Sequence, residues 1–380
     1  MHVLTLTPFY PTAADDAQGC FIAEPLQHME EFGVTHSVIA VQPFYRGKTH
    51  ANPAIFPARW KRYFAIPGGK GLASAGFFLF VGLLSEVRRL HKSRPIDLIH
   101  AHAPLPCGHA AALLSHEFRI PFVVSVHGLD AFADNQVKGW AGRWCRHVSQ
   151  YVYRSAKNVI CISGKVRERV LEGGANYRTS VVYNGVDHEL FSSPTETVNR
   201  RPVILSVGNL ISIKGHELLL RALALIQAKF PDLSCEIIGD GPERSHLDAL
   251  VSELGLSGKV NFRGRCTRAE VAEAMRQCSL FVLPSRYEGL GCVYLEAMSA
   301  GKPAVACRGQ GIEEIIRHGI TGWLVGTDSI QELADGLERL LGDPQLRIEI
   351  GDAARQTVLR AFTLRHQAEH LSHIYQECLA

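Results

Sequence analysis

The sequence predicts an α/β protein made of two doubly wound parallel-sheet domains that face a cleft. With 380 residues, the chain is longer than one compact core normally is, so two domains are expected. Short apolar runs alternate with helix-like segments in two separate blocks, and this alternation is typical of parallel sheets covered by helices. Such sheets bind ligands at the carboxyl ends of their strands, where the candidate motifs described below also lie.

The first block contains six expected strands and at least five expected helices. The strands are predicted at residues 3–7, 37–41, 96–100, 122–126, 159–162 and 179–183. The helices are predicted at residues 21–32, 71–84, 107–118 and 138–155, and after Ser163 as an N-cap. Residues 43–70 are rich in proline, glycine and basic residues, so we expect an irregular insertion there.

The second block begins after a polar stretch at residues 195–201, which is the best candidate for a linker. Its strands are predicted at residues 203–207, 235–238, 259–262, 280–283 and 304–306. Its helices are predicted at residues 217–230, 243–254, 268–277 and 292–300. The chain is therefore expected to divide at about residues 198–199.

The composition excludes several classes of protein. The net charge is +3 and charged residues make up 20%, which gives no sign of a nucleic-acid binder. The ten cysteines form no CxxC pair, so we interpret them as small buried hydrophobes in a reducing cytosol. The N-terminus lacks the basic region and long apolar core of a signal peptide, and a cytoplasmic location is expected.

The longest apolar run covers residues 71–84 and is too short to span a bilayer. Basic residues lie on both sides of it, namely Arg59, Lys61, Arg62, Lys70, Arg88, Arg89, Lys92 and Arg94. One interpretation is a buried helix with solvated basic flanks. The other is a helix that touches an anionic membrane surface or a lipid-linked acceptor.

Residues 284–303 (PSRYEGLGCVYLEAMSAGKP) follow the apolar run at residues 280–283 and read as a loop and a helix. The glycines let the backbone approach a ligand closely, and the helix start adds its positive dipole end. Glu288 lies in the loop and Glu296 lies about one turn into the helix. Two carboxylates beside an anion-binding helix start suggest a ligand that carries both phosphate and hydroxyl groups.

Three further stretches follow predicted strands. Lys214, in a loop that opens a helix, is suited to phosphate binding, although the spacing is not that of a Walker loop. Gly239-Asp240-Gly241-Pro242 is either a tight turn or a loop that approaches a nucleotide. His127 can act as a general base or as a hydrogen-bond partner of a sugar hydroxyl or phosphate.

The sequence offers no pattern typical of a metal or dinucleotide site. It has no Asp-x-Asp pair and no cluster of histidine, cysteine and carboxylate residues with metal-ligand spacing. The GxGxxG fingerprint is also absent, since only Gly19 follows the first strand. We therefore expect no cofactor, and a diphosphate neutralised by cationic side chains and helix dipoles instead of Mg²⁺.

Together these motifs resemble the retaining glycosyltransferases of family 4, which have the GT-B fold. Glu288, seven residues and Glu296 are similar to the family's E-x7-E motif. Four other stretches occur in the family's order and at similar distances, namely His127-Gly128, Asn184-Gly185-Val186-Asp187, Lys214-Gly215 and Gly239-Asp240-Gly241-Pro242. The stretch that ends in Gly19-Cys20-Phe21 is similar to the family's N-terminal glycine loop. The resemblance covers nearly the whole chain. It implies a Rossmann-like acceptor domain at residues 1–198, a Rossmann-like donor domain at 199–361, and a helix within 362–380 that packs back on the first domain.

The resemblance also implies a role for each charged residue of the site. Lys214 would neutralise the leaving diphosphate, and His127 would orient the donor sugar. Glu288 would bind a hydroxyl of the donor sugar without acting as a nucleophile. Glu296 would accept hydrogen bonds from the ribose hydroxyls. His127, Lys214 and Glu288 are thus the expected catalytic residues.

A set of donor-binding positions is implied around them. The helix start would hold the sugar and the diphosphate, with Gly289, Leu290, Gly291, Cys292 and Val293. The remaining donor-binding positions are Gly19, Asn209, Gly241 and Pro242 along the phosphates and nucleotide, and Arg265 near the base.

The chain departs from the family pattern at two of these positions. Asn209 stands where the family usually has an arginine, which removes a cation from the diphosphate site. We hypothesise that Arg286 or Arg265 compensates. Gln18-Gly19 stands where two glycines are often adjacent, which affects the contact of that loop with the phosphates.

The expected function is transfer of a hexose from a nucleotide-diphosphate sugar to a glycan or lipid-linked acceptor, with retention, in cell-surface polysaccharide or glycolipid synthesis. Weak contact with the inner membrane face is expected from the basic residues around the apolar run. A nucleotide-sugar epimerase on the same fold is an alternative, and so is a non-catalytic partner of another glycosyltransferase.

Overall fold

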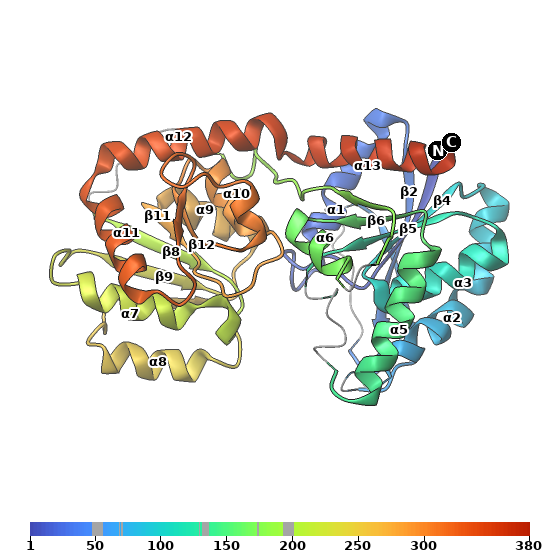
Figure 1. Cartoon of the computed structure of the whole chain (residues 1–380), viewed down its shortest axis with the longest axis horizontal. Coiled ribbons are helices and arrows are strands. Elements are labelled where there is room, and N and C mark those ends of the chain that lie inside the picture. Colours follow the sequence, from blue (N-terminus) through green and yellow to red (C-terminus); the bar gives the residue numbers. More distant parts are fainter. Residues whose placement is uncertain are drawn as a thin grey trace. The chain divides into compact units, whose positions relative to one another are not determined.

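The computed structural model describes residues 1–47, 56–67, 69, 71–128, 130, 137–172, 175–192 and 201–380. The chain forms two compact units, Met1–Asn184 with Leu364–Ala380, and Gly185–Thr363 (Figure 1). The linker predicted at residues 195–201 and the boundary predicted after residue 198 fall almost entirely in residues 193–200, which lie outside the described residues.

The first unit is built on a parallel sheet of seven strands in the order β3-β2-β1-β4-β5-β6-β7. The strands are β1 (His2–Thr7), β2 (Thr35–Pro43), β3 (Ala58–Tyr63), β4 (Leu98–His102), β5 (Phe122–Val126), β6 (Asn158–Cys161) and β7 (Thr179–Val181). Its helices are α1 (Cys20–Ala23), α2 (Leu72–Ser93), α3 (His109–Phe118), α5 (Trp140–Ser155), α6 (Gly164–Val170) and α13 (Leu364–Leu379), with a 3-10 helix at Pro25–Phe32. The prediction of a doubly wound parallel sheet is confirmed for this unit.

Strand β3 lies in the segment for which an irregular insertion was expected. It pairs in parallel with β2, from Val38 opposite Ala58 to Pro43 opposite Tyr63. Its sequence, ARWKRY, carries three basic residues, and most of its side chains are partly exposed. An edge strand of this kind lacks the apolar run that marks a buried strand, so the expectation of an insertion was wrong for these residues.

Helix α2 is longer than predicted. It spans 22 residues, Leu72–Ser93, because buried residues recur along one face as far as Leu79, Leu83 and Val87. Arg88 and Arg89 therefore lie on the helix itself and not beyond its end. Within the described residues, no helix combines the length and apolar character needed to cross a membrane.

The second unit contains a parallel sheet of six strands in the order β10-β9-β8-β11-β12-β13. The strands are β8 (Val203–Val207), β9 (Ser234–Ile238), β10 (Val260–Gly264), β11 (Leu280–Val282), β12 (Ala304–Cys307) and β13 (Trp323–Val325). Its helices are α7 (His216–Ile226), α8 (Arg244–Glu253), α9 (Arg268–Gln277), α10 (Cys292–Ser299), α11 (Ile330–Gly342) and α12 (Pro344–Ala361). Helix α7 contacts α8 and α11, whereas α10 contacts α9 and α12, so helices cover both faces of the sheet (Figure 1).

The last helix, α13, packs in the first unit, although it follows the second unit in the chain. Ala368, Leu371 and Ile374 of α13 are buried in one apolar cluster with Val3 of β1 and Met29. The chain leaves and re-enters this unit close to one point, because Val186 N–H donates to the Phe362 carbonyl at 2.9 Å.

Candidate active site

Most of the predicted site residues lie along one edge of the second sheet. Four adjacent strands, β10, β9, β8 and β11, end in loops that carry Arg265, Gly241 with Pro242, Asn209 with Lys214, and Glu288 respectively. In a parallel sheet the carboxyl ends of all strands meet at the same edge, where ligands bind. The structure therefore brings these sequence-predicted residues into one row.

An ion pair between Lys214 and Glu288 joins two of these loops. Lys214 Nζ lies 2.5 Å from Glu288 Oε2, and the two side chains are 20% and 13% exposed. Gly215 positions the lysine, because it has a φ of +73° and a Cβ there would lie 2.1 Å from the Pro284 carbonyl oxygen. The sequence analysis predicted both residues but not that they pair with each other.

Glu288 is also held through its backbone by the loop after β12. Its N–H donates to Gln310 Oε1 at 2.9 Å, and Gly311 N–H donates to the Glu288 carbonyl at 3.0 Å. Gln310 is buried, with 7% of its surface exposed. The residue fixes the position of the loop in which the carboxylate lies, and sequence reasoning did not find it.

The start of α10 packs tightly against Glu288. Gly291 has a φ of +82°, and a Cβ there would lie 2.6 Å from the Tyr294 ring and 2.8 Å from Glu288 Cγ. Tyr294 is buried and donates its hydroxyl to the Leu283 carbonyl at 2.5 Å. Burial raises the pKa of this phenol well above its usual value, so it remains a donor. The buried Tyr294 ring, packed against Gly291, thus positions the start of the helix.

The five residues predicted at this helix start differ in accessibility. Gly289 and Leu290 are buried, and the Leu290 side chain is completely covered. Gly291, Cys292 and Val293 are partly exposed. The helix dipole favours an anion at this end, and the accessible part of the turn begins at Gly291.

Glu296 has a different environment from Glu288. Its Oε1 lies 2.8 Å from Arg268 Nη1, and the two side chains are only 6% and 10% exposed. The Arg268 guanidinium also lies over the Phe191 ring, 5.1 Å from its centroid. The second carboxylate of the predicted motif is therefore part of a buried ion pair, and its arginine was not predicted.

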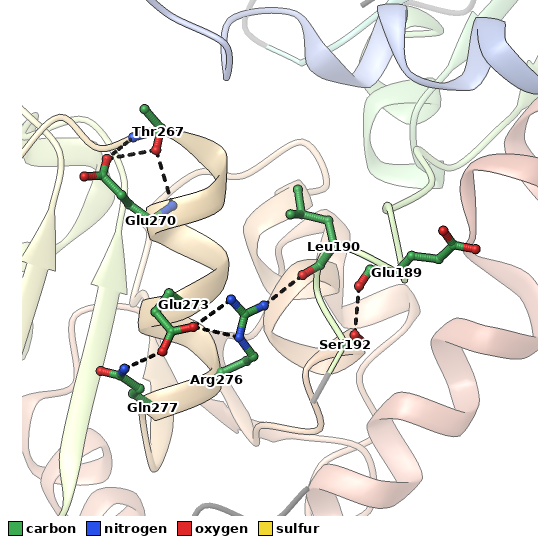
Figure 2. Close-up of polar contacts among 8 residues, drawn as sticks. All are labelled: Glu189, Leu190, Ser192, Thr267, Glu270, Glu273, Arg276 and Gln277. Atoms are coloured by element: carbon green, nitrogen blue, oxygen red, sulfur yellow. Dashed lines mark hydrogen bonds and ion pairs between the residues drawn. The ribbon is translucent and has the colours of Figure 1, made fainter. Parts of the chain in front are cut away.

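Helix α9, which carries Arg268 in its first turn, is held at both of its ends by polar contacts. At the N-terminus, Thr267 and Glu270 form a reciprocal capping box. Near the C-terminus, Arg276 Nη1 donates to the Leu190 carbonyl at 3.1 Å, which ties down the segment that carries Phe191 (Figure 2). The helix and this segment thus form one support for the buried ion pair.

The glycines of the β8 and β9 loops have a structural explanation. A Cβ on Gly239 would lie 1.9 Å from the Gly208 carbonyl oxygen, and one on Gly241 would lie 2.5 Å from that of Leu210. Leu210 N–H donates to the Asp240 carbonyl at 3.0 Å. The absence of side chains at Gly239 and Gly241 therefore lets the two loops meet. Exposed Asn209 and Pro242 lie on these joined loops.

The two arginines proposed to compensate for Asn209 lie at opposite ends of the row. Arg286 donates from Nη1 to the Ser212 carbonyl at 2.8 Å, and its Nε lies 2.6 Å from Asp328 Oδ1. It therefore joins the loop before Glu288 to the loop that carries Lys214. Arg265 is exposed after β10, and Gly264 in front of it accepts the Gly239 N–H at 2.8 Å.

His127 follows β5 in the first unit, and its ring is part of a row of histidines. His127 Nε2 lies 3.0 Å from His102 Nδ1, while Nδ1 is buried and has no hydrogen-bond partner in the described part of the chain. The backbone N–H of His127 donates to both carboxylate oxygens of Asp130, at 2.8 and 3.0 Å. Burial lowers the pKa of His127 to about 3, so the ring is neutral at physiological pH.

The Gly19 loop also reaches His127. Gly19 has a φ of +75°, and a Cβ there would lie 2.6 Å from the Phe9 carbonyl oxygen. The rings of Phe9 and Phe21 lie 6.3 and 4.9 Å from that of His127, measured between centroids. The structure thus brings Gly19 and His127 together in the first unit, as it does the other predicted residues in the second.

Comparison with known proteins identifies the family. Residues 187–357 match the family model "Glycosyl transferases group 1", and residues 21–190 match "Glycosyltransferase Family 4". An uncharacterized glycosyltransferase of Methanocaldococcus jannaschii is 32% identical over 270 residues, which are 71% of this chain and 72% of that protein. The chain belongs to glycosyltransferase family 4.

Two further comparisons cover the whole length of this glycosyltransferase. The putative teichuronic acid biosynthesis glycosyltransferase TuaC of Bacillus subtilis is 27% identical, with 99% of this chain and 98% of that protein aligned. The structure of Anabaena Alr3699/HepE in complex with UDP-glucose matches with a TM-score of 0.75 and 22% identity, over 99% of this chain and 100% of that one. The fold is therefore GT-B, as the resemblance implied.

Sequence reasoning missed three residues of the glycosyltransferase that support predicted ones. Arg268 lies within a recognisable capping box, between Thr267 and Glu270, but nothing in its position indicates that it meets Glu296. His102 ends an alternating His-Ala-His stretch after an apolar strand, a signal that could have been used. Gln310 has no signal in the sequence. Each of the three contacts a predicted residue, and the spacing of motifs in the sequence does not reveal such contacts.

In the described residues of the glycosyltransferase, no group of three or more histidine, cysteine, aspartate or glutamate side chains is arranged to hold a metal ion. Lys214, Arg286 and the start of α10 contribute positive charge at the carboxyl end of the second sheet.

Proposed function

We propose that this glycosyltransferase moves a hexose-type sugar from a nucleotide-diphosphate sugar to a glycan or lipid-linked acceptor, with retention, in cell-surface polysaccharide or glycolipid synthesis. The observation that carries the proposal is the half-buried Lys214–Glu288 pair beside the start of α10. The donor class is supported by the similarity to the Anabaena protein solved with UDP-glucose. The acceptor class is supported by the similarity to the teichuronic acid enzyme.

The pair provides a cation for the leaving diphosphate and a hydrogen-bond acceptor for a hydroxyl of the sugar. As the bond from the sugar to the diphosphate breaks, negative charge grows on the leaving oxygen, and a fixed cation stabilises it without having to reorganise. Lys214 supplies that cation, and the helix dipole of α10 adds to it. Glu288 keeps Lys214 in place before the donor binds and accepts a hydrogen bond from a sugar hydroxyl afterwards. Glu296 contacts the ribose beside its ion pair with Arg268.

Retention follows from the position of the carboxylate in this proposal. Glu288 is occupied by Lys214, so it is a poor nucleophile, and the acceptor attacks the face from which the diphosphate leaves. The leaving phosphate takes the acceptor's proton. The reaction needs no metal, because protein cations neutralise the diphosphate. Proton NMR of the first product formed tests the stereochemistry, and an inverted anomer would refute it. Full activity in excess EDTA tests the absence of a metal.

The experiment that tests the function is a screen of nucleotide-diphosphate sugars followed by a transfer assay. Bound donor stabilises the folded state by mass action, so the right donor raises the melting temperature. With that donor, Lys214→Ala should lose at least 100-fold in kcat, the size typical for loss of a transition-state donor. Lys229→Ala is the control, since Lys229 forms an exposed ion pair with Glu338 at 2.6 Å.

Three results would contradict the proposal. If Lys214→Ala and Lys229→Ala transfer sugar equally well, Lys214 has no part in the chemistry. If the wild-type protein releases an altered free nucleotide sugar and glycosylates nothing, the protein is an epimerase on this fold. Absence of both activities, with donor still bound, would favour a non-catalytic partner.

A weak contact with an anionic membrane surface belongs to the same proposal. Phe77 and Val81 on α2 are each 51% exposed, and Phe64, stacked on Phe44, is 50% exposed. Residues 56–94 contain eight lysines and arginines but one acidic residue, Glu86, which pairs with Lys61 at 2.8 Å. Exposed aromatic side chains beside a basic surface are suited to anionic lipid headgroups.

Liposome sedimentation tests this contact. Binding to vesicles that contain anionic lipid should fall with rising salt, and Phe77→Ser should weaken it. Leu225→Ser is the matched control, since Leu225 is 55% exposed on α7 of the other unit. Equal binding of both variants, or no salt-sensitive binding by the wild type, would rule the contact out.

A further inference from the structure

A pair of histidines connects the ends of two neighbouring strands in the first unit. His102 closes β4, and β4 pairs with β5 so that His102 lies opposite Ser125, two residues before His127. The two imidazole rings stack with their centroids 5.2 Å apart and their planes at 19°. Nδ1 of His102 and Nε2 of His127 are 3.0 Å apart, which is a hydrogen bond.

His102 is itself held firmly. It is 5% exposed, and its ring packs against that of His100 with centroids 4.2 Å apart. Both ring nitrogens of His100 are hydrogen-bonded, Nδ1 to the Tyr375 hydroxyl at 2.6 Å and Nε2 to Ser125 Oγ at 2.7 Å. His102 therefore packs against an imidazole that is itself fixed at both ring nitrogens.

This arrangement leaves His127 one ring atom with which to meet a ligand. Nε2 is bound to His102, and Nδ1 is buried without a partner in the described part of the chain. The rings of Phe9 and Phe21 lie close to the imidazole and limit its rotation. A buried polar atom without a partner is uncommon in a folded protein and calls for an explanation.

We propose that His102 is a positioning residue, which fixes the ring and the tautomer of His127 so that His127 meets a hydroxyl of a sugar substrate through Nδ1 alone. The inference rests on the proposed function, since it assigns the atom that contacts a sugar substrate. It also decides between the two roles that the sequence left open for His127. The residue is a neutral hydrogen-bond partner and not the general base.

The chemistry of the pair supports that choice. One hydrogen bond between two neutral imidazoles holds one proton, so the tautomer of each ring determines that of the other. A carboxylate in the place of His102 would stabilise the imidazolium and make His127 a better base. A second imidazole gives no such stabilisation, and burial lowers the pKa of both rings, that of His127 to about 3. A base this weak does not remove the proton of an acceptor hydroxyl.

Two substitutions at His102 distinguish a role in hydrogen bonding to His127 from a role in filling space. In His102→Asn the amide takes the place of Nδ1 and can still bond to Nε2 of His127, whereas His102→Leu removes the polar atom. We expect kcat/KM for the donor to fall about tenfold in His102→Leu, the effect of one hydrogen bond, and Asn to restore most of it. His2→Leu is the control, because His2 is also 5% exposed and bonds to Ser37 and Pro95 on the same sheet.

The second measurement does not depend on activity. Long-range ¹H–¹⁵N NMR of the full-length protein with labelled histidine reports which ring nitrogen carries the proton, and His127→Gln identifies the His127 signals. We expect one neutral tautomer of His127 from pH 6 to 8 in the wild type and in His102→Asn. His102→Leu should give a mixture of both tautomers.

The outcomes separate this inference from the proposed function. If His127 keeps the same single tautomer in His102→Leu, or if Asn and Leu lower kcat/KM equally, His102 does not position His127. If the His127 tautomer changes as expected but the wild type transfers no sugar, the histidine pair stands and the proposed function fails. If His2→Leu loses as much activity as His102→Leu, the effect is one of stability and the inference is overturned.

Discussion

The two glutamates of the E-x7-E motif each meet one cation, but in different surroundings. Glu288 pairs with Lys214 at a site where both side chains keep some exposure, 13% and 20%. Glu296 pairs with Arg268 where 6% and 10% of the side chains are exposed. Removal of such charges from water is costly, and only the partner and its hydrogen bonds offset that cost. The first pair is therefore suited to exchange partners during a reaction and the second to remain intact.

Removal of one partner from the buried pair should destabilise the protein strongly. Arg268→Ala leaves the Glu296 carboxylate buried without its cation, and we expect a loss of about 3 kcal/mol or more in the free energy of unfolding. Urea denaturation measures it. Arg339→Ala is the control, since Arg339 and Asp343 are an exposed pair with side chains 61% and 34% exposed. A loss below that of the control would show that the buried pair is not formed.

Gly291 should tolerate alanine less well than another glycine with the same backbone conformation. Its φ is +82° and a Cβ would lie 2.6 Å from the Tyr294 ring, whereas Gly319 has a φ of +73° and open space around it. Alanine at either position costs about 1 to 2 kcal/mol for the backbone conformation. Gly291→Ala should cost more than this and weaken donor binding, because Glu288 must move. Equal unfolding free energies and equal donor affinities in the two variants would contradict the packing described here.

At the level of helices and strands, the site depends on how each element is held at its end. Helix α9 begins with a capping box at Thr267, one residue before Arg268. Helix α11 also begins with a side-chain cap, in which Ser329 Oγ accepts a hydrogen bond from the Glu332 N–H, but no predicted site residue lies on this helix. Loss of the cap in each helix therefore distinguishes the effect of a cap on stability from its effect on donor binding.

Loss of the α9 cap should disturb both stability and donor binding. Thr267→Ala removes an acceptor for the Glu270 N–H, and the loss of an N-cap costs about 1 kcal/mol. Ser329→Ala should cost about as much for the same reason. Only Thr267→Ala should also raise the dissociation constant for the donor, since Arg268 lies in the first turn of α9. Calorimetric titration with the donor checks this, and equal affinities in both variants would show that α9 does not transmit the change.

Most elements could be predicted from the sequence because they bury continuous apolar runs or one periodic face. Strands β5 and β12 are completely buried, and their sequences show it. Strand β3 could not be found, since its exposed basic residues resemble a loop and only pairing with β2 makes it a strand. The end of α2 was missed for a related reason. Basic residues lie on the same helix as Leu83 and Val87, and these charges obscured the helical period of the apolar residues.

The residues of the site were predictable where a motif carries them, but their partners were not. Lys214 and Glu288 each follow a strand, and the strand order that makes them neighbours is a property of the whole sheet. Arg268 and Glu296 are 28 residues apart in the chain, with nothing in the spacing to relate them. His102 meets His127 through the register between β4 and β5. Contacts of this kind are decided by tertiary structure and not by local pattern.

Across the whole molecule, histidines kept neutral by burial are distributed unevenly between the two units. In the first unit burial lowers the pKa of His36 and His127 to about 3, and those of His100 and His102 well below the usual value. In the second unit burial lowers that of His216 to about 4. The first unit therefore contains four of these five histidines, and the two units should respond differently to acid.

The sign of that response follows from proton binding. A histidine with a lowered folded-state pKa binds a proton in the unfolded chain below about pH 6.5 but stays neutral in the folded one. Its neutral form thus favours folding fully above pH 6.5, and this stability is lost as the pH falls towards the folded-state pKa. For the buried His100 and His102, the loss is about 1.4 kcal/mol per pH unit for each.

We therefore expect acid to open the first unit before the second. Hydrogen exchange followed by mass spectrometry at pH 7, 6 and 5, corrected for the intrinsic exchange rate, measures opening peptide by peptide. Peptides from β4, β5 and α13 should lose protection between pH 6 and 5, whereas those from β8 and β11 should lose less. The second unit has one histidine of this kind, His216, so the protection of its peptides should fall less steeply with decreasing pH. Equal slopes in both sets of peptides would show that the histidine row does not control stability, and that acid acts through groups common to both units.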